Sequence, residues 1–195
     1  VVLTAQQPAS AFARGRGPTP RAAASSFCSN LSRIAHTLEH LASTLQDASP
    51  LECLALLVRG LGLLEKALTV SLAEEETHDG LRKSFRRMLE AAELAGKQVR
   101  ASSQLPCSVE NMRPPAKPNG VVFDFAVQQA KEAAVALSKG HEAGGWEAQV
   151  HEKLSLALLL FDLLGAEAAG EEAAALAPYA EHVARLLGEI EARLG

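Results

Sequence analysis

The chain has 195 residues, of which 48% are hydrophobic and 4% aromatic, and its formal net charge is −4. This charge argues against a general nucleic-acid binder, which would usually be basic. No run of 18 or more apolar residues is available to span a bilayer. Abundant Ala and Leu, without long β-branched or aromatic runs, favour an all-α protein. The length allows one domain or two small ones.

Residues 1–26 contain arginine, proline, glycine and serine but no acidic side chain. Such a composition occurs in transit peptides, although a disordered linker is the interpretation that we favour. The chain begins with Val1 rather than Met, so we expect a fragment or a processed product. The three cysteines, Cys28, Cys53 and Cys107, form no C-x-x-C motif. We interpret them as reduced thiols of a cytoplasmic protein.

Three amphipathic helices are predicted in the first half of the chain. Apolar residues recur at steps of three and four from Phe27 onwards, which is typical of one helix face. The stretch DASP then breaks the periodicity, and its Pro50 suits the first turn of the next helix. The first bundle is expected over residues 27–103, with helices over 27–45, 51–72 and 81–102.

The second half repeats this organisation after a break. Residues 104–120 contain four prolines and no periodicity, which predicts a Pro-rich linker. Apolar positions of the two halves match at an offset of 96 in the first two helices, which indicates a duplicated three-helix unit. Two units of roughly 70 residues are each near the lower limit for a self-sufficient core, so we expect them to pack together. The second bundle is predicted over residues 121–195, with helices over 121–138, 146–165 and 171–194.

The stretch HTLEH formally fits H-x-x-E-H, an inverted zinc-protease signature. His36 and His40 would lie one helical turn apart. They share a face with Ser43 and Asp47, however, and that face should be solvated. An open zinc site also needs a third protein ligand. We therefore set aside a zinc hydrolase, and we predict no catalytic residue, no metal site and no cofactor.

A basic patch is predicted on the first turns of the third helix. It comprises Arg82, Lys83, Arg86 and Arg87. A solvated face is the simplest interpretation, and the functional alternative is a surface for anionic lipid or an acidic partner segment. The glutamates at 74–76 would partly offset this positive charge.

The helix predicted at 146–165 is apolar almost all the way round, since nine of the eleven residues from 154 to 164 are apolar. One buried stripe needs only three or four apolar positions in two turns. We expect one face to pack inside the bundle, and a flanking face to be covered by the sister bundle or by an amphipathic partner helix. The predicted inward stripe consists of Val150, Leu154, Ala157, Phe161 and Leu164.

A partner groove is predicted between the fourth and fifth helices of the chain. Its position follows from the apolar side chains that fall outside one stripe on each helix. The inward stripe of the fourth helix is expected at Phe123, Val127, Ala130, Ala134 and Leu137. The walls of the predicted groove are Val122, Phe125, Leu156, Leu159 and Leu163.

Three segments of the second half follow one another in a characteristic order. They are the aromatic-led helix FDFAVQQAKEAAV, the leucine-dense helix KLSLALLLFDLL and the closing amphipathic helix YAEHVARLLGEIEARL. Together they resemble the C-terminal early autophagy targeting/tethering region of the autophagy-initiating Unc-51-like serine/threonine kinases, a tandem of MIT (microtubule interacting and transport) domains. The likeness is strongest over residues 121–194. Over 27–103, mainly the number and order of helices agree.

The resemblance implies an all-α fold of two tandem three-helix MIT-like bundles packed together. It implies a regulatory segment without its kinase domain, since the chain has no GxGxxG, HRD or DFG motif. The implied partner is the kinase's HORMA-domain regulatory subunit, whose short helical motifs lie in MIT grooves. The implied location is the cytoplasm, with recruitment to the forming autophagosome and peripheral contact with anionic membranes.

Two other functions remain open at this point. An MIT protein could instead read the tails of ESCRT-III subunits, which carry helical motifs of their own. The bundles could also form a structural helical scaffold with no groove ligand.

Overall fold

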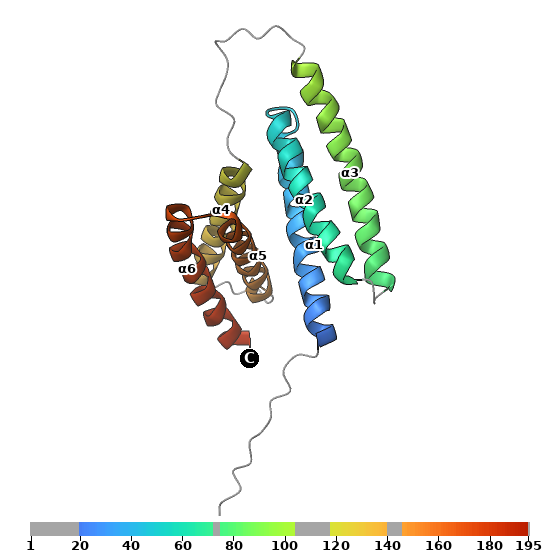
Figure 1. Cartoon of the computed structure of the whole chain (residues 1–195). Helices are drawn as coiled ribbons and strands as arrows, with labels where there is room; N and C mark the ends of the chain where they lie inside the picture. The colour runs from blue at the N-terminus through green and yellow to red at the C-terminus, as the bar shows by residue number, and fades with distance from the viewer. Residues whose placement is uncertain (1–19, 72–74, 104–117, 140–145, 195) are drawn as a thin grey trace, which may run out of the picture.

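The computed structural model describes residues 20–71, 75–103, 118–139 and 146–194. Within these ranges the chain is helical, without any strand, and the predicted all-α fold of two tandem three-helix bundles is confirmed. Figure 1 shows the two bundles side by side. The helices are α1 (Pro20–Leu45), α2 (Pro50–Val70), α3 (Glu75–Ser103), α4 (Pro118–Lys139), α5 (Trp146–Glu167) and α6 (Glu171–Leu194).

The helix starts differ most from the sequence prediction at α1, which begins at Pro20 rather than at Phe27. Proline is favoured at the first helical position, and the alanines that follow are strong helix formers, so the helix extends back into the predicted linker. α4 likewise begins at Pro118, before the predicted start at 121. Residues 1–19 and 104–117, which hold most of both predicted linkers, lie outside the described residues.

The middle helix of each bundle packs on both of its neighbours. α2 contacts α1 and α3, and α5 contacts α4 and α6. The two bundles meet where α1 packs on α4 and α5 and where α2 packs on α4. α3 and α6 therefore lie on opposite outer sides of the molecule (Figure 1). None of the described helices is long and apolar enough to cross a membrane.

A glycine sets the turn between α5 and α6. Gly170 has a φ of 58°, in the left-handed region that L-residues other than glycine rarely adopt. The last turn of α5 is extended by a hydrogen bond from the Ala168 N–H to the Leu164 carbonyl. The Gly170 carbonyl accepts from the Ala174 N–H and so begins α6. The tight connection brings α6 back against α5.

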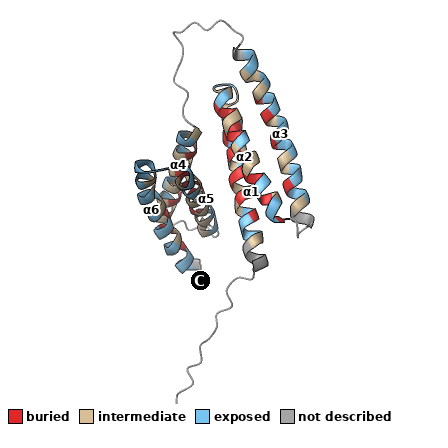
Figure 2. Cartoon of the chain, viewed as in Figure 1, coloured by how far each residue is buried: buried red, intermediate tan, exposed pale blue. Residues whose placement is uncertain are grey.

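The hydrophobic core is concentrated where the middle helices meet their neighbours (Figure 2). The predicted inward stripe of α5 is confirmed, because all five of its residues are buried. The offset is not 96, however, since every buried α5 residue lies 97 positions after a buried α2 residue. The pairs are Cys53/Val150, Leu57/Leu154, Gly60/Ala157, Leu63/Leu160, Leu64/Phe161 and Ala67/Leu164.

Candidate partner-binding grooves

An apolar groove lies between α4 and α6, with Phe161 of α5 as its floor. Its cavity volume is about 410 Å³, within the range of pockets that bind ligands. Mostly apolar residues line it, with Lys131 and His182 as the polar exceptions. The full lining is Val127, Ala130, Lys131, Ala134, Phe161, Pro178, Tyr179, His182 and Val183.

A second hollow of about 620 Å³ continues this groove toward the first turns of α4 and α6. Higher residue numbers on both helices line the first hollow and lower numbers line the second, so α4 and α6 run parallel. The second hollow is lined by Asn119, Gly120, Phe123, Leu164, Ala168, Glu172, Ala175, Leu176 and Tyr179. We call the two hollows together the α4–α6 groove.

Three aromatic rings from three helices meet where the two hollows join. The ring centroid of Tyr179 lies 5.1 Å from that of Phe123 and 5.9 Å from that of Phe161. Phe123 and Phe161 pack edge to face at 6.0 Å. Tyr179 is 46% exposed, an unusual amount for a ring in such a cluster. It divides the groove and offers one aromatic face to a ligand.

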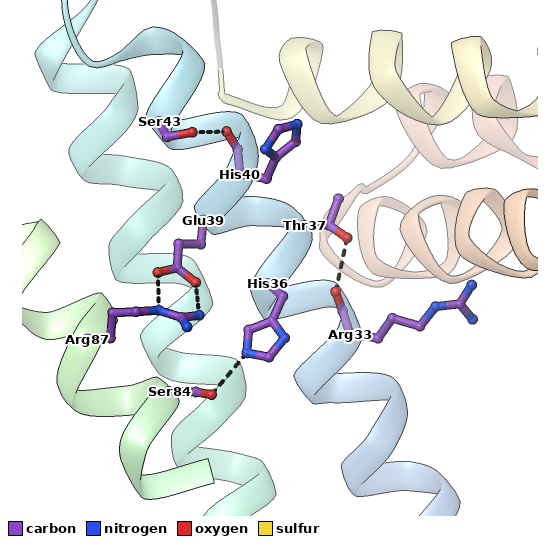
Figure 3. A network of polar contacts seen from close by, with 8 residues as sticks. All are labelled: Arg33, His36, Thr37, Glu39, His40, Ser43, Ser84 and Arg87. Atoms are coloured by element: carbon purple, nitrogen blue, oxygen red, sulfur yellow. Dashed lines mark hydrogen bonds and ion pairs between the residues drawn. The ribbon is translucent and has the colours of Figure 1, made fainter. Parts of the chain in front are cut away.

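The corresponding seam in the first bundle, between α1 and α3, is polar. It is bridged by Arg87, whose Nε and Nη2 donate to the two carboxylate oxygens of Glu39 at 2.8 and 2.6 Å (Figure 3). His36 Nε2 lies 3.0 Å from Ser84 Oγ beside this ion pair. We call these two contacts the α1–α3 bridge. The cavity next to it, of about 610 Å³, is lined by Ser25, Cys28, Ser29, Ser32, Arg33, His36, Gly80, Leu81 and Ser84.

The five residues predicted as groove walls do not line either hollow of the α4–α6 groove. Val122 is fully buried. The other four are half-buried and pack against the core. They therefore contribute to the packed interior, and partner contact at these residues stays a prediction.

The face of α5 that carries Leu156, Leu159 and Leu163 is bounded by contacts to the first bundle. At one end Arg33 of α1 donates to the Glu152 carbonyl at 2.7 Å. At the other end Arg59 of α2 pairs with Glu167 at 2.8 Å and donates to Asn119 of α4 at 2.9 Å. Glu152, the three leucines and Glu167 are separated by steps of three or four residues, so they lie on one face of the helix. The first bundle is thus anchored at both ends of this face, from which we infer that it covers the apolar excess of the helix.

The stripe that the sequence predicted to face the bundle interior on α4 packs against the core as half-buried side chains, and all of it except Leu137 also borders the groove. Phe123, Val127, Ala130 and Ala134 line its two hollows. The fully buried residues of α4 are Val122, Ala126 and Ala133. The signal that could have located the groove is the small size of two alanines within an apolar stripe, since small side chains leave room between helices.

The predicted basic patch is exposed along its whole length on α3. Only one of its four members has a partner among the described residues. Arg87 is paired with Glu39, whose hydrogen bond and charge raise the pKa of the guanidinium. The other three have no ion pair within the described part of the chain. An anionic partner would therefore meet three available cations, Arg82, Lys83 and Arg86.

The HTLEH stretch takes part in helix packing. His36 contacts Ser84, Glu39 is bound to Arg87, and His40 is exposed. Among the described residues, no group of three potential ligands lies close enough together to hold a metal ion. Elsewhere, burial raises the pKa of the Cys53 thiol, which keeps it protonated. Cys107 lies outside the described residues.

The fold is similar to that of a chain in the crystal structure of the Atg1–Atg13 complex, with a TM-score of 0.74. The match covers 89% of this chain and 99% of that chain, at 14% sequence identity. No protein-family model matches the sequence, and no curated protein matches it either. The likeness is thus one of fold, extending over both bundles.

Proposed function

We propose that this chain is a non-catalytic regulatory module of an autophagy-initiating protein kinase, and that it binds helical motifs of an Atg13-type, HORMA-domain regulatory subunit. The observation that carries the proposal is the fold match over nearly all of both chains to a structure of an Atg1–Atg13 complex. The resemblance of the helix pattern in residues 121–194 to the tails of Unc-51-like kinases supports the same assignment.

The α4–α6 groove is the binding site that we propose for one such motif. An amphipathic helix buries its apolar face when it lies in a groove between two helices. The groove presents Val127, Ala130 and Ala134 on one side and Val183 on the other, with the Phe161 ring beneath them. Phe161 and Val183 are buried at the base of this apolar surface, and the three α4 residues are half-buried along it. An elongated apolar surface between two helices suits a helical segment better than a compact small molecule.

The basic patch is the surface that we propose for recruitment to the forming autophagosome from the cytoplasm. Arg82, Lys83 and Arg86 project from α3, on the outer side of the first bundle. Anionic lipid headgroups attract such exposed cations by about 1 kcal/mol each near a membrane surface. This contact would be separate from partner binding, because α6 and the groove lie on the opposite side of the molecule (Figure 1).

Two substitutions on one helix test the partner site. Val127→Asp places a carboxylate in the groove, whereas Val135→Asp places it at a position that is 49% exposed and lines neither hollow. An unpaired charge in an apolar interface costs several kcal/mol, so Val127→Asp should weaken binding of the Atg13-type subunit about 100-fold or more. Val135→Asp should leave affinity within about twofold, since exposed charges contribute little.

Isothermal titration calorimetry with the purified subunit measures both affinities, and circular dichroism melting confirms that each variant is folded. Equal affinity of wild type and folded Val127→Asp would remove the groove from the proposal. Failure of the wild-type chain to bind the subunit at all would contradict the proposed function itself. Binding to ESCRT-III tails in the same assay would favour the alternative MIT function.

A further inference from the structure

The two ends of the α4–α6 groove differ in charge. Lys131 and His182 line the hollow beside the middle turns of α4 and α6. Glu172 is the charged residue lining the other hollow, beside the first turns of both helices. Because α4 and α6 run parallel, this places a basic end and an acidic end on one continuous apolar surface.

The contact with Arg185 makes Nε2 the donor atom of neutral His182. Its Nδ1 lies 3.2 Å from Nη2 of Arg185. A guanidinium can only donate, so Nδ1 accepts and the ring proton resides on Nε2. Arg185 is itself paired with Glu189 at 2.8 Å, on the exposed side of α6. The basic end therefore offers the Lys131 ammonium and an imidazole N–H, both of which suit a carboxylate.

The helix dipoles favour the same direction for a bound helix, although their partial charges are opposite in sign to the neighbouring side chains. The first turns of α4 and α6 carry partial positive charge and their last turns partial negative charge. A helix lying in the groove with its C-terminal end over the first turns of α4 and α6 is favourably oriented against both. A stable free helix tends to carry acidic residues near its N-terminus and basic residues near its C-terminus. Such a segment would place its carboxylates over Lys131 and its cations over Glu172.

We propose that the groove accepts an amphipathic partner helix in one direction, antiparallel to α4 and α6, with acidic residues in its first turn and basic residues in its last. Two apolar anchors of this helix, about two turns or 11 Å apart, enter the two hollows on either side of Tyr179. The inference rests on the proposed function, and it specifies the chemistry and orientation of the segment that the site takes.

Two synthetic peptides test the orientation. Both are amphipathic, about four helical turns long, with leucines two turns apart. The first carries glutamates at its N-terminal end and lysines at its C-terminal end, and the second has these charges exchanged. The first peptide also carries a photo-crosslinking phenylalanine analogue at its N-terminus. Crosslinks mapped by mass spectrometry should fall on residues 178–183, near His182, rather than on residues 171–176, near Glu172.

A charge-exchanged protein separates groove electrostatics from peptide helicity. The first peptide is the better helix in isolation, so it should bind wild type more tightly for two reasons. In the double variant Lys131→Glu with Glu172→Lys, the first peptide is still the better helix. The charges of the groove, however, now favour binding of the second peptide. The ratio of the two affinities should therefore fall about fivefold relative to wild type, and this change should diminish at high salt. Tyr179→Ala should weaken both peptides to a similar extent if they occupy the groove.

Crosslinks near Glu172, or an affinity ratio unchanged in the charge-exchanged protein, would overturn the proposed direction. Absence of binding by both peptides, or binding that Tyr179→Ala leaves intact, would overturn the proposed chemistry of the occupant. Either result leaves the proposed function to its own test, because the comparison of Val127→Asp with Val135→Asp uses the whole regulatory subunit.

Discussion

The two bundles share a fold but present different chemistry between their first and third helices. When the middle helices are aligned at the offset of 97, the α1–α3 seam and the α4–α6 groove occupy corresponding places. The first is lined mainly by polar residues, four of them serines, and is bridged by Glu39 and Arg87. The second is lined mainly by alanine, valine and aromatic rings. Two bundles of the same fold therefore present different surfaces at corresponding seams.

One pair of positions accounts for much of this difference. Arg87 of α3 and Arg185 of α6 are 98 residues apart, the same spacing as that of the buried pairs Met88/Leu186 and Ala92/Ile190 on these helices. Arg87 faces a carboxylate across the seam, whereas the groove wall opposite α6 carries Ala134. Without a cross-groove partner, Arg185 bonds to His182 and Glu189 on its own helix. The second groove consequently has no polar bridge across it within the described residues.

The largest effect should come from breaking the packing that joins the two bundles. Leu159→Asp puts an unpaired carboxylate on the α5 face that the first bundle covers, and it should lower the free energy of unfolding by about 3 kcal/mol or more. Val58→Asp, at a position that is 57% exposed on α2, is the control and should change it by less than about 0.5 kcal/mol.

Chemical denaturation of the free protein gives both values. If Leu159→Asp leaves stability unchanged but abolishes partner binding, the flank predicted from sequence is the true partner groove. The walls of the partner groove would then be the five residues predicted from the sequence, Val122, Phe125, Leu156, Leu159 and Leu163.

An intermediate effect is expected from giving the second bundle the polar bridge of the first. Ala134→Glu places a carboxylate on the groove wall, in the hollow that His182 of α6 also lines. It should reduce affinity for the Atg13-type subunit at least tenfold. The glutamate side chain would occupy space that the partner needs, and binding would remove water from its charge in an apolar groove. Stability should change by less than about 1 kcal/mol, as for other exposed ion pairs.

Val135→Glu, on the exposed side of the same helix, is the matched control and should not affect binding. Titration calorimetry and thermal melting on both variants separate loss of the groove from loss of the fold. Undiminished binding by Ala134→Glu would show that the difference between the two seams does not decide where the partner docks.

The smallest effects should come from two glycines of α2 that differ in surroundings. A Cβ at Gly60 would lie 2.6 Å from Met88 Sδ, whereas one at Gly62 would meet no atom within 4 Å. Gly62→Ala should therefore stabilise the protein by about 0.5–1 kcal/mol through helix propensity. Gly60→Ala should cost about 1–2 kcal/mol, since overpacking outweighs the same propensity gain.

Melting temperatures of the two variants provide the comparison. Ala157 corresponds to Gly60 in the second bundle, so that bundle already accommodates a Cβ where its helices cross. Equal stabilisation by both glycine substitutions would show that the α2–α3 crossing has room to relax, and that the two bundles do not differ in this contact.

Much of the architecture was predictable from local signals in the sequence. The α6 bounds agree with the prediction, and the inward stripe of α5 is correct, because apolar periodicity and helix-breaking residues act over a few residues at a time. The start of α1 was missed because an alanine-rich segment after Pro20 has helix propensity without apolar periodicity. Propensity and periodicity are separate signals, and the prediction followed periodicity.

What the sequence by itself determined is the number, order and approximate length of the helices, together with their division into two bundles. The tertiary structure alone decided which residues of α4 became fully buried and where the leucine-rich flank of α5 lies relative to the first bundle. On a helix with apolar residues on several sides, local patterns favour more than one orientation, and the choice depends on neighbours that lie far away in sequence. Arg33 and Arg59 hold the leucine-rich flank of α5 against the first bundle. The face of α4 that carries Val127, Ala130 and Ala134 stays half-buried at the groove. The reason is that small side chains opposite α6 do not fill the space between the two helices.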